Sequence, residues 1–153
     1  MATDSTPVKI RFRFYSDMME QEAEEILIAE MIDVGLGQYK ISSIPFYVEG
    51  IATEDIVYAE YEEAGKMLLF KEKLQPSGNS NVWVAITDDE ILIDEVREIF
   101  TSLGCNSMAM GERYLALEVK AQNNYFKVKD RLNQLRANGI VDYAESCISA
   151  QHI

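Results

Sequence analysis

The chain has 153 residues, a formal net charge of −12 at pH 7 and a hydrophobic content of 48%. That length suffices for one domain or two small fused subdomains, and the hydrophobic content excludes an intrinsically disordered chain. An acidic surface repels nucleic acids and anionic membranes, so we expect neither as a partner and expect basic surfaces instead.

The negative charge is concentrated in residues 1–65, which hold fourteen Asp or Glu against four Lys or Arg. The start of the chain lacks the basic and apolar regions of a signal peptide, and no apolar run approaches the ~20 residues of a membrane span. We therefore expect a cytoplasmic protein whose two cysteines, Cys105 and Cys147, are reduced and far apart.

The first predicted element covers residues 8–15, where apolar and polar side chains alternate as in a half-buried strand. Residues 20–34 fit either a helix, because of their Glu and Ala content, or a strand. We favour a strand from about residue 25, because turn-forming glycines follow. The apolar side chains that such a strand places on one face are Ile26, Ile28 and Ile32.

Short strand-like segments follow at 39–41 and, after Pro45, at 46–48. Residues 55–61 and 66–71 are separated by a Glu-Glu-Ala-Gly turn, which indicates a β-hairpin. The pattern predicts an all-β subdomain over residues 8–75, folded as a small β-barrel.

The segment Pro76–Ser80 is rich in turn formers, and the pattern changes after it. A strand at 82–86 precedes a helix that Thr87 is expected to cap and that ends at Gly104. Two strands, a second helix at about 124–138 and a last strand from residue 140 follow. This βαββαβ order predicts a ferredoxin-like subdomain over residues 81–150, and hence an α+β protein.

The chain resembles a widespread bacterial family known as a domain of unknown function. The resemblance lies in a Ser-Ile-Pro-Phe turn at 43–46, a Ser-Gly-Asn-Ser turn at 77–80 and Leu-Gly-Cys at 103–105. Family members carry Asn where this chain has Ser43 and Gly where it has Glu54. The resemblance implies the fold, and the similarity of some small acidic members to immunity proteins implies a toxin as partner.

The chain lacks a recognisable catalytic or metal motif. His152, the only histidine, lies next to the end of the chain, where termini usually fray, so we expect it to be solvent-exposed. One histidine and two distant cysteines do not make a zinc site, and neither cysteine has a histidine nearby in sequence. We therefore expect a protein that is not an enzyme and has no cofactor.

These observations predict an immunity protein that blocks a basic bacterial toxin, such as a nuclease of the contact-dependent inhibition type, as a monomer in a 1:1 complex. Carboxylates would take the place of substrate phosphates, and tyrosines would supply contact area. The alternative is a regulatory or small-ligand-binding module without catalytic activity. The predicted contact residues are Asp17, Glu20, Glu22, Glu24, Tyr47, Glu54, Asp55, Tyr58, Glu60, Tyr61, Glu62 and Glu63.

Overall fold

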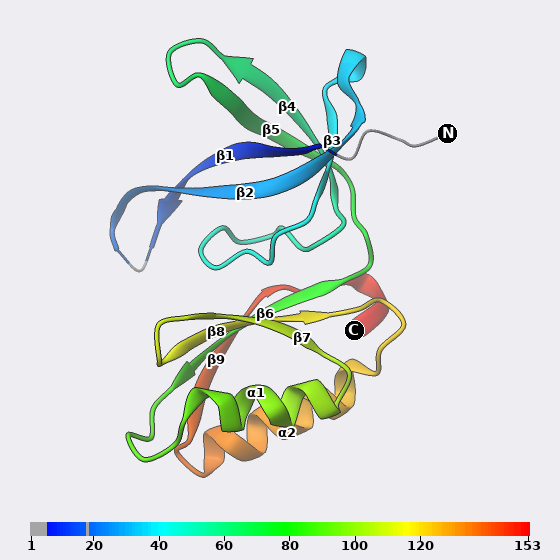
Figure 1. The fold of residues 1–153 in the computed structure, drawn as a ribbon. Coiled ribbons are helices and arrows are strands. Elements are labelled where there is room, and N and C mark those ends of the chain that lie inside the picture. Colours follow the sequence, from blue (N-terminus) through cyan, green and yellow to red (C-terminus); the bar gives the residue numbers. More distant parts are fainter. Residues whose placement is uncertain (1–5, 18) are drawn as a thin grey trace. The chain divides into compact units, whose positions relative to one another are not determined.

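The computed structural model describes residues 6–17 and 19–153 (Figure 1). The chain divides into two compact units, Met1–Ser77 and Gly78–Ile153, called unit 1 and unit 2 below. The division falls inside the turn-rich segment Pro76–Ser80. In the described residues no helix is long and apolar enough to cross a membrane.

Unit 1 is a closed β-barrel in which consecutive strands pair antiparallel and a parallel contact between the first and last strands completes the ring. The predicted barrel is therefore confirmed. Strands in which apolar and polar residues alternate can form a closed barrel because each strand turns its apolar face toward the interior. Its strands are β1 (Pro7–Ser16), β2 (Gln21–Asp33), β3 (Gln38–Ile41), β4 (Ile56–Glu62) and β5 (Met67–Gln75). Buried side chains inside the barrel include Ile10, Phe12, Leu27, Ile41 and Val57.

Strand β2 is extended over its whole length, so the helical alternative for residues 20–34 is wrong. Its isoleucines share one face, but that face points outward. In the β1–β2 pairing Leu27 lies opposite the buried Ile10, whereas Ile26 lies opposite Arg11. Residues directly opposite each other share a face of the sheet, so this register turns Leu27 inward and Ile26 outward.

The segment between β3 and β4 is irregular, so the strand expected at 46–48 does not form. Glu25 on β2 explains why. Its carboxylate accepts hydrogen bonds of 2.8–3.0 Å from the backbone N–H groups of Phe46, Tyr47 and Val48, which a strand would direct to a neighbouring strand. The loop therefore folds onto β2 and places Val48 and Ile51 in the barrel core.

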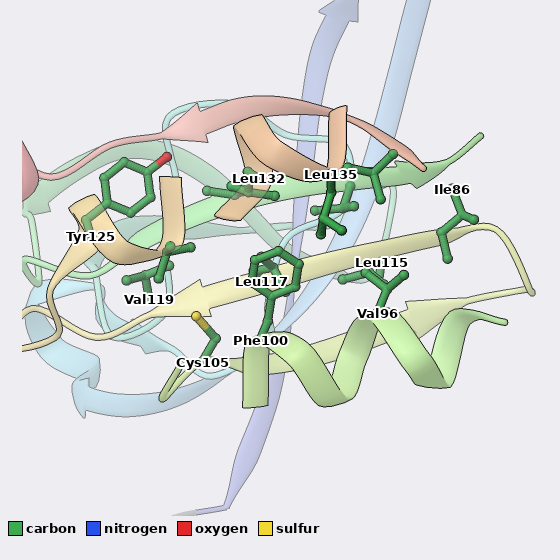
Figure 2. Packing of buried hydrophobic residues seen from close by; sticks show 14 residues of the cluster. Ile86, Val96, Phe100, Cys105, Leu115, Leu117, Val119, Tyr125, Leu132 and Leu135 are labelled. Atoms are coloured by element: carbon green, nitrogen blue, oxygen red, sulfur yellow. The ribbon is translucent and has the colours of Figure 1, made fainter. Parts of the chain in front are cut away.

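Unit 2 is a four-stranded antiparallel sheet with two helices packed on one face (Figures 1 and 2). The strand order is β7-β8-β6-β9, which confirms the ferredoxin-like plan. The strands are β6 (Ser80–Ile86), β7 (Asn106–Met110), β8 (Tyr114–Val119) and β9 (Val141–Cys147), and the helices are α1 (Ile93–Ser102) and α2 (Tyr125–Ala137). Figure 2 shows Phe100 of α1 and Leu132 and Leu135 of α2 directed at the sheet residues Leu115 and Leu117.

Helix α1 begins six residues after Thr87, so the predicted capping role of Thr87 is wrong. Thr87 instead donates a hydrogen bond to the carbonyl of Gly139, and Asp88 accepts one from the amide of Glu90. The side chains of Thr87 and Asp88 therefore form hydrogen bonds in a turn before the helix and do not cap it. The helix start is satisfied by Glu95, whose carboxylate accepts from the amide of Leu92 at 3.0 Å.

The two cysteines are not joined by a disulfide, as predicted. Cys105 immediately precedes the edge strand β7, and Cys147 ends the opposite edge strand β9. Burial, and secondarily the charge of Glu118, raises the pKa of the Cys105 thiol to about 12. Cys105 is therefore protonated near neutral pH and does not act as a nucleophile there.

Candidate partner-binding surface

The hairpins β1–β2 and β4–β5 project from the same side of the barrel (Figure 1). At the turn of the first hairpin, Asp17, Glu20 and Glu22 are exposed, and Glu22 lies opposite Tyr15, whose exposed fraction is 59%. At the turn of the second, Tyr61 is 60% exposed and Glu63 is exposed. We call these six residues the hairpin end: Tyr15, Asp17, Glu20, Glu22, Tyr61 and Glu63.

An ion-pair network ties the two hairpins together. The guanidinium of Arg13 binds both carboxylate oxygens of Glu62, at 2.8 and 3.0 Å. Arg11 lies 3.6 Å from Glu24 and 3.9 Å from Glu62, and a Cβ added at Gly65 would come within 2.5 Å of the Arg11 guanidinium. Bidentate arginine contacts fix geometry, so this network positions the second hairpin beside the first.

The predicted contact residues Glu24 and Glu62 therefore form ion pairs with arginines of the same chain. Glu60 also has partners in the chain, because it accepts a 2.5 Å hydrogen bond from the hydroxyl of Tyr58 and lies 3.9 Å from Lys71. The hydrogen bond to Glu60 is the main reason why the pKa of Tyr58 is raised. These side chains shape the outer barrel wall, whereas the acids of the hairpin end make no ion pair among the described residues.

Asp55 was predicted to lie on the binding face, and this is wrong because only 1% of the residue is exposed. Its oxygens accept hydrogen bonds from the amides of Ala52 and Ser77, at 2.9 and 2.8 Å, and from Lys73 at 3.2 Å. A buried carboxylate is stable only with such partners. Asp55 therefore anchors the end of unit 1 and is not available to a second molecule.

Tyr47 and Glu54 are exposed, but they lie on the loop between β3 and β4 and not at the hairpin end. Glu54 adopts the left-handed backbone conformation, with φ of 69°. Such a conformation favours glycine because an ordinary side chain meets its own backbone there.

Sequence reasoning missed the organising role of Arg11 and Arg13. A signal for it was present, because the basic residues of β1 alternate with its core residues and Glu24 falls opposite Arg13 once the two strands form a hairpin. The contact with Glu62, which is 49 residues away from Arg13, had no local signal.

The expectation that His152 is exposed is wrong, since the residue is only 5% exposed. The chain ends in a short 3-10 helix, Ala150–His152, that brings the imidazole back onto the sheet. Its Nδ1 lies 2.6 Å from the hydroxyl of Ser80, and its Nε2 lies 3.0 Å from the carbonyl of Lys120. A serine and a histidine in contact resemble a nucleophile and its base, but Ser80 is 1% exposed, so substrate cannot reach it.

The turns at residues 43–46 and 77–80 make hydrogen bonds within the chain. The Ser43 hydroxyl accepts a hydrogen bond from the amide of Ile28 at 2.9 Å. The Ser77 hydroxyl donates to the carbonyl of Thr53, and Gly104 follows α1 with φ of 86°. Among the described residues no group of three or more potential metal ligands occurs.

Comparison with known proteins identifies the family of the chain and a solved structure with a similar fold. The chain belongs to the DUF4265 family, a domain of unknown function, whose profile matches residues 25–143. A crystal structure of a hypothetical protein from Neisseria gonorrhoeae is similar, with 26% identity and a TM-score of 0.80 over 97% of this chain and 99% of that chain. No curated protein shows significant similarity.

Proposed function

We propose that this protein is a non-enzymatic, cytoplasmic immunity protein that binds and blocks a basic bacterial toxin, of the nuclease type used in contact-dependent growth inhibition. The observation that carries the proposal is the hairpin end. There, four exposed acids make no ion pair among the described residues, and Tyr15 and Tyr61 are each about three-fifths exposed.

The physical argument rests on which acids are available. Glu24, Glu60 and Glu62 are neutralised by arginine or lysine, and Asp55 is buried with Lys73. The acids of the hairpin end make no ion pair among the described residues, so their carboxylates are available to bind another molecule. Carboxylates bind the arginine and lysine side chains that a nuclease uses for phosphate, and exposed tyrosines supply rigid contact area at low entropic cost.

The proposed mechanism is occlusion of the toxin's active site. The net charge of the protein attracts a basic domain over a distance of about a Debye length, roughly 8–10 Å in physiological salt. The hairpin end then occupies the position of the nucleic acid. Electrostatic attraction of this kind mainly accelerates association, whereas closely packed central contacts mainly slow dissociation.

The test begins with the reading frames next to the gene for this chain. A neighbouring protein with a basic C-terminal domain is expressed with and without the immunity protein, and cell growth is scored together with binding rates. A triple variant, D17N/E20Q/E22Q, should slow association and reduce protection, and high salt should shrink the difference from the unmodified protein.

The matched control is E90Q/D94N/E98Q, which removes the same charge from unit 2. Glu90, Asp94 and Glu98 are exposed and make no ion pair among the described residues, so this control should leave protection intact. Equal losses in both variants would show that only the net charge matters. A larger loss in the control would move the contact to α1 and contradict the proposal.

A second candidate function, small-ligand binding by a regulatory module, is favoured by a groove of about 400 Å³ between α1 and α2. Lys127 and Arg131 line it together with one acid, Asp130, and neither cation forms an ion pair among the described residues. Ile99 and Leu103 supply apolar surface. Such a groove suits a small organic anion. Titration with phenyl phosphate, followed by amide NMR shifts, should be saturable in the unmodified protein and weaker in R131Q if this candidate is correct.

A further inference from the structure

The two hairpins that form the hairpin end, β1–β2 and β4–β5, share little backbone pairing, and Figure 1 shows them diverging toward their turns. Strands β1 and β5 pair at Ile10–Leu68 and at Arg11–Leu69, and no other backbone pairing between the two hairpins occurs among the described residues. The rest of β1 toward its turn, residues 12–16, therefore depends on side-chain contacts for its position relative to the second hairpin.

Two kinds of side-chain contact cross between the hairpins beyond the paired residues. In the barrel core, the rings of Phe12 and Phe70 stack with their centroids 4.5 Å apart. On the outer surface, the Arg13 guanidinium donates to both carboxylate oxygens of Glu62, at 2.8 and 3.0 Å. Glu62 is the last residue of β4 and directly precedes the second turn, so this ion pair restrains the hairpins close to that turn.

The ion pair of Arg13 and Glu62 belongs to a network that holds its geometry. Glu24 lies opposite Arg13 in the β1–β2 pairing, and its carboxylate is 3.9 Å from Arg13 and 3.6 Å from Arg11. Arg11 in turn lies 3.9 Å from Glu62, so the positive and negative charges of the four side chains balance. An isolated surface ion pair contributes little to stability, but a bidentate arginine within a network keeps a defined geometry.

We propose that Arg13 is a positioning residue for partner binding, which acts through Glu62 to hold the first hairpin, with Tyr15, in a fixed place relative to the second hairpin, with Tyr61. This inference rests on the proposed function, in which the hairpin end contacts a basic toxin. A surface that is ordered before binding loses less conformational entropy when its partner binds, and the affinity is higher for that reason. The consequence is that a cation of this protein strengthens the binding of a basic partner.

The variant Arg13→Gln is a test in which charge and positioning predict opposite results. It removes one positive charge and changes the net charge from −12 to −13, so electrostatic attraction alone would favour the binding of a basic toxin. Loss of positioning has the opposite effect, and most effects of this kind appear in the dissociation rate. We expect the toxin to dissociate about fivefold or more faster from R13Q than from the unmodified protein.

The matched control is Lys9→Gln. Lys9 is an exposed cation on the same strand and makes no ion pair among the described residues, so K9Q changes the charge equally and should leave the dissociation rate unchanged. A third variant, Arg13→Lys, keeps the net charge at −12. Its single ammonium group cannot form two parallel hydrogen bonds with Glu62, so the toxin should dissociate from R13K at a rate between those of the unmodified protein and R13Q.

The position of the hairpins is measured without a toxin. Spin labels are attached to the full chain at E22C on the first hairpin and E63C on the second, with C147S to remove the half-exposed thiol, while Cys105 is buried. Pulsed electron paramagnetic resonance then gives the distribution of distances between the two labels. Adding R13Q should broaden this distribution, whereas adding K9Q should leave it unchanged. Thermal melting of each variant establishes that it is folded.

A distance distribution that is as narrow with R13Q as with K9Q would overturn the proposal. So would a broader distribution combined with dissociation of the toxin from R13Q as slow as from K9Q, because the binding surface would then not need the restraint. If no neighbouring toxin binds the unmodified protein, the immunity role fails, and the label distances still decide whether Arg13 positions the hairpins. Failure of the positioning role and failure of the immunity role therefore give different results.

Discussion

The imidazole Nδ1 of His152 lies 2.6 Å from the hydroxyl oxygen of Ser80, a residue 72 positions earlier in the chain. The other ring nitrogen faces the carbonyl of Lys120, which can only accept, so Nε2 carries the proton and Nδ1 accepts from Ser80. The Ser80 oxygen in turn accepts from the amide of Ser149. The C-terminus of unit 2 is thus joined to the first strand of its sheet.

Replacing His152 by alanine should destabilise unit 2 by about 2–4 kcal/mol, because it removes the hydrogen bonds of the buried imidazole with the Ser80 hydroxyl and the Lys120 carbonyl and the ring contact with Tyr125. Urea unfolding of the full chain measures the effect. Deletion of Ile153, which is 87% exposed, is the control and should change the free energy of unfolding by less than about 0.5 kcal/mol. If His152→Ala changed the free energy of unfolding as little as the control does, the hydrogen bonds of His152 would not be needed for stability.

Replacing Glu25 by alanine should cost unit 1 about 2–4 kcal/mol, since three backbone donors of the loop lose one shared acceptor. Hydrogen exchange should show faster exchange for the amides of Phe46, Tyr47 and Val48 than in the unmodified protein. The control is Glu22→Ala, an exposed acid on the same strand, which should leave those amides protected. Unchanged exchange in Glu25→Ala would mean that the loop is held by its buried side chains alone.

At position 54, glycine should be more stabilising than alanine by about 1 kcal/mol, because the backbone there has φ of 69°. Comparing Glu54→Gly with Glu54→Ala cancels the loss of the glutamate side chain, which both variants share. Thermal or urea unfolding gives the difference in the free energy of unfolding. Equal stability of the two variants would show that the loop relaxes out of the left-handed conformation.

The two thiols should differ in reactivity. At about pH 8 iodoacetamide should modify the half-exposed Cys147 in the native protein and Cys105 only after unfolding, because burial keeps Cys105 protonated. Mass spectrometry of the labelled peptides measures both. Native-state labelling of Cys105 at the rate of Cys147 would contradict the packing around β7.

The raised pKa of Cys105 also predicts that unit 2 loses stability at alkaline pH. The thiol ionises near its ordinary value of 9.0 in the unfolded chain and near 12 in the folded one. Its contribution to stability is therefore fully present below pH 9.0 and is lost as the pH rises toward 12. Urea unfolding as a function of pH should show a steeper alkaline loss in the unmodified protein than in Cys105→Ala. Burial raises the pKa of Tyr125 as well, so part of the loss should persist in that variant.

Local sequence signals predicted the five strands of the barrel, with one further strand at 46–48 that does not form, and the four strands and two α-helices of the ferredoxin-like unit. They did so because alternation and helical spacing reflect which side chains one element can bury. The 3-10 helix Ala150–His152 was not predicted. Helix α2, which was predicted at about 124–138, spans Tyr125–Ala137 and buries Tyr125, Val128, Leu132 and Leu135, which recur at helical spacing. The start of α1 was misplaced because Thr87 and Glu90 match a capping pattern that a turn can also use.

By itself the sequence determined that the protein is acidic, has two units of different architecture and carries its excess charge in the first. Only the tertiary structure decided which of those charges remain available. Glu62 is neutralised by Arg13 across 49 residues, Asp55 is buried with Lys73, and His152 is buried against Ser80. The physical reason is that ion pairing and burial depend on neighbours that strand register and barrel closure bring together. The sequence around a single residue does not indicate which neighbours these will be.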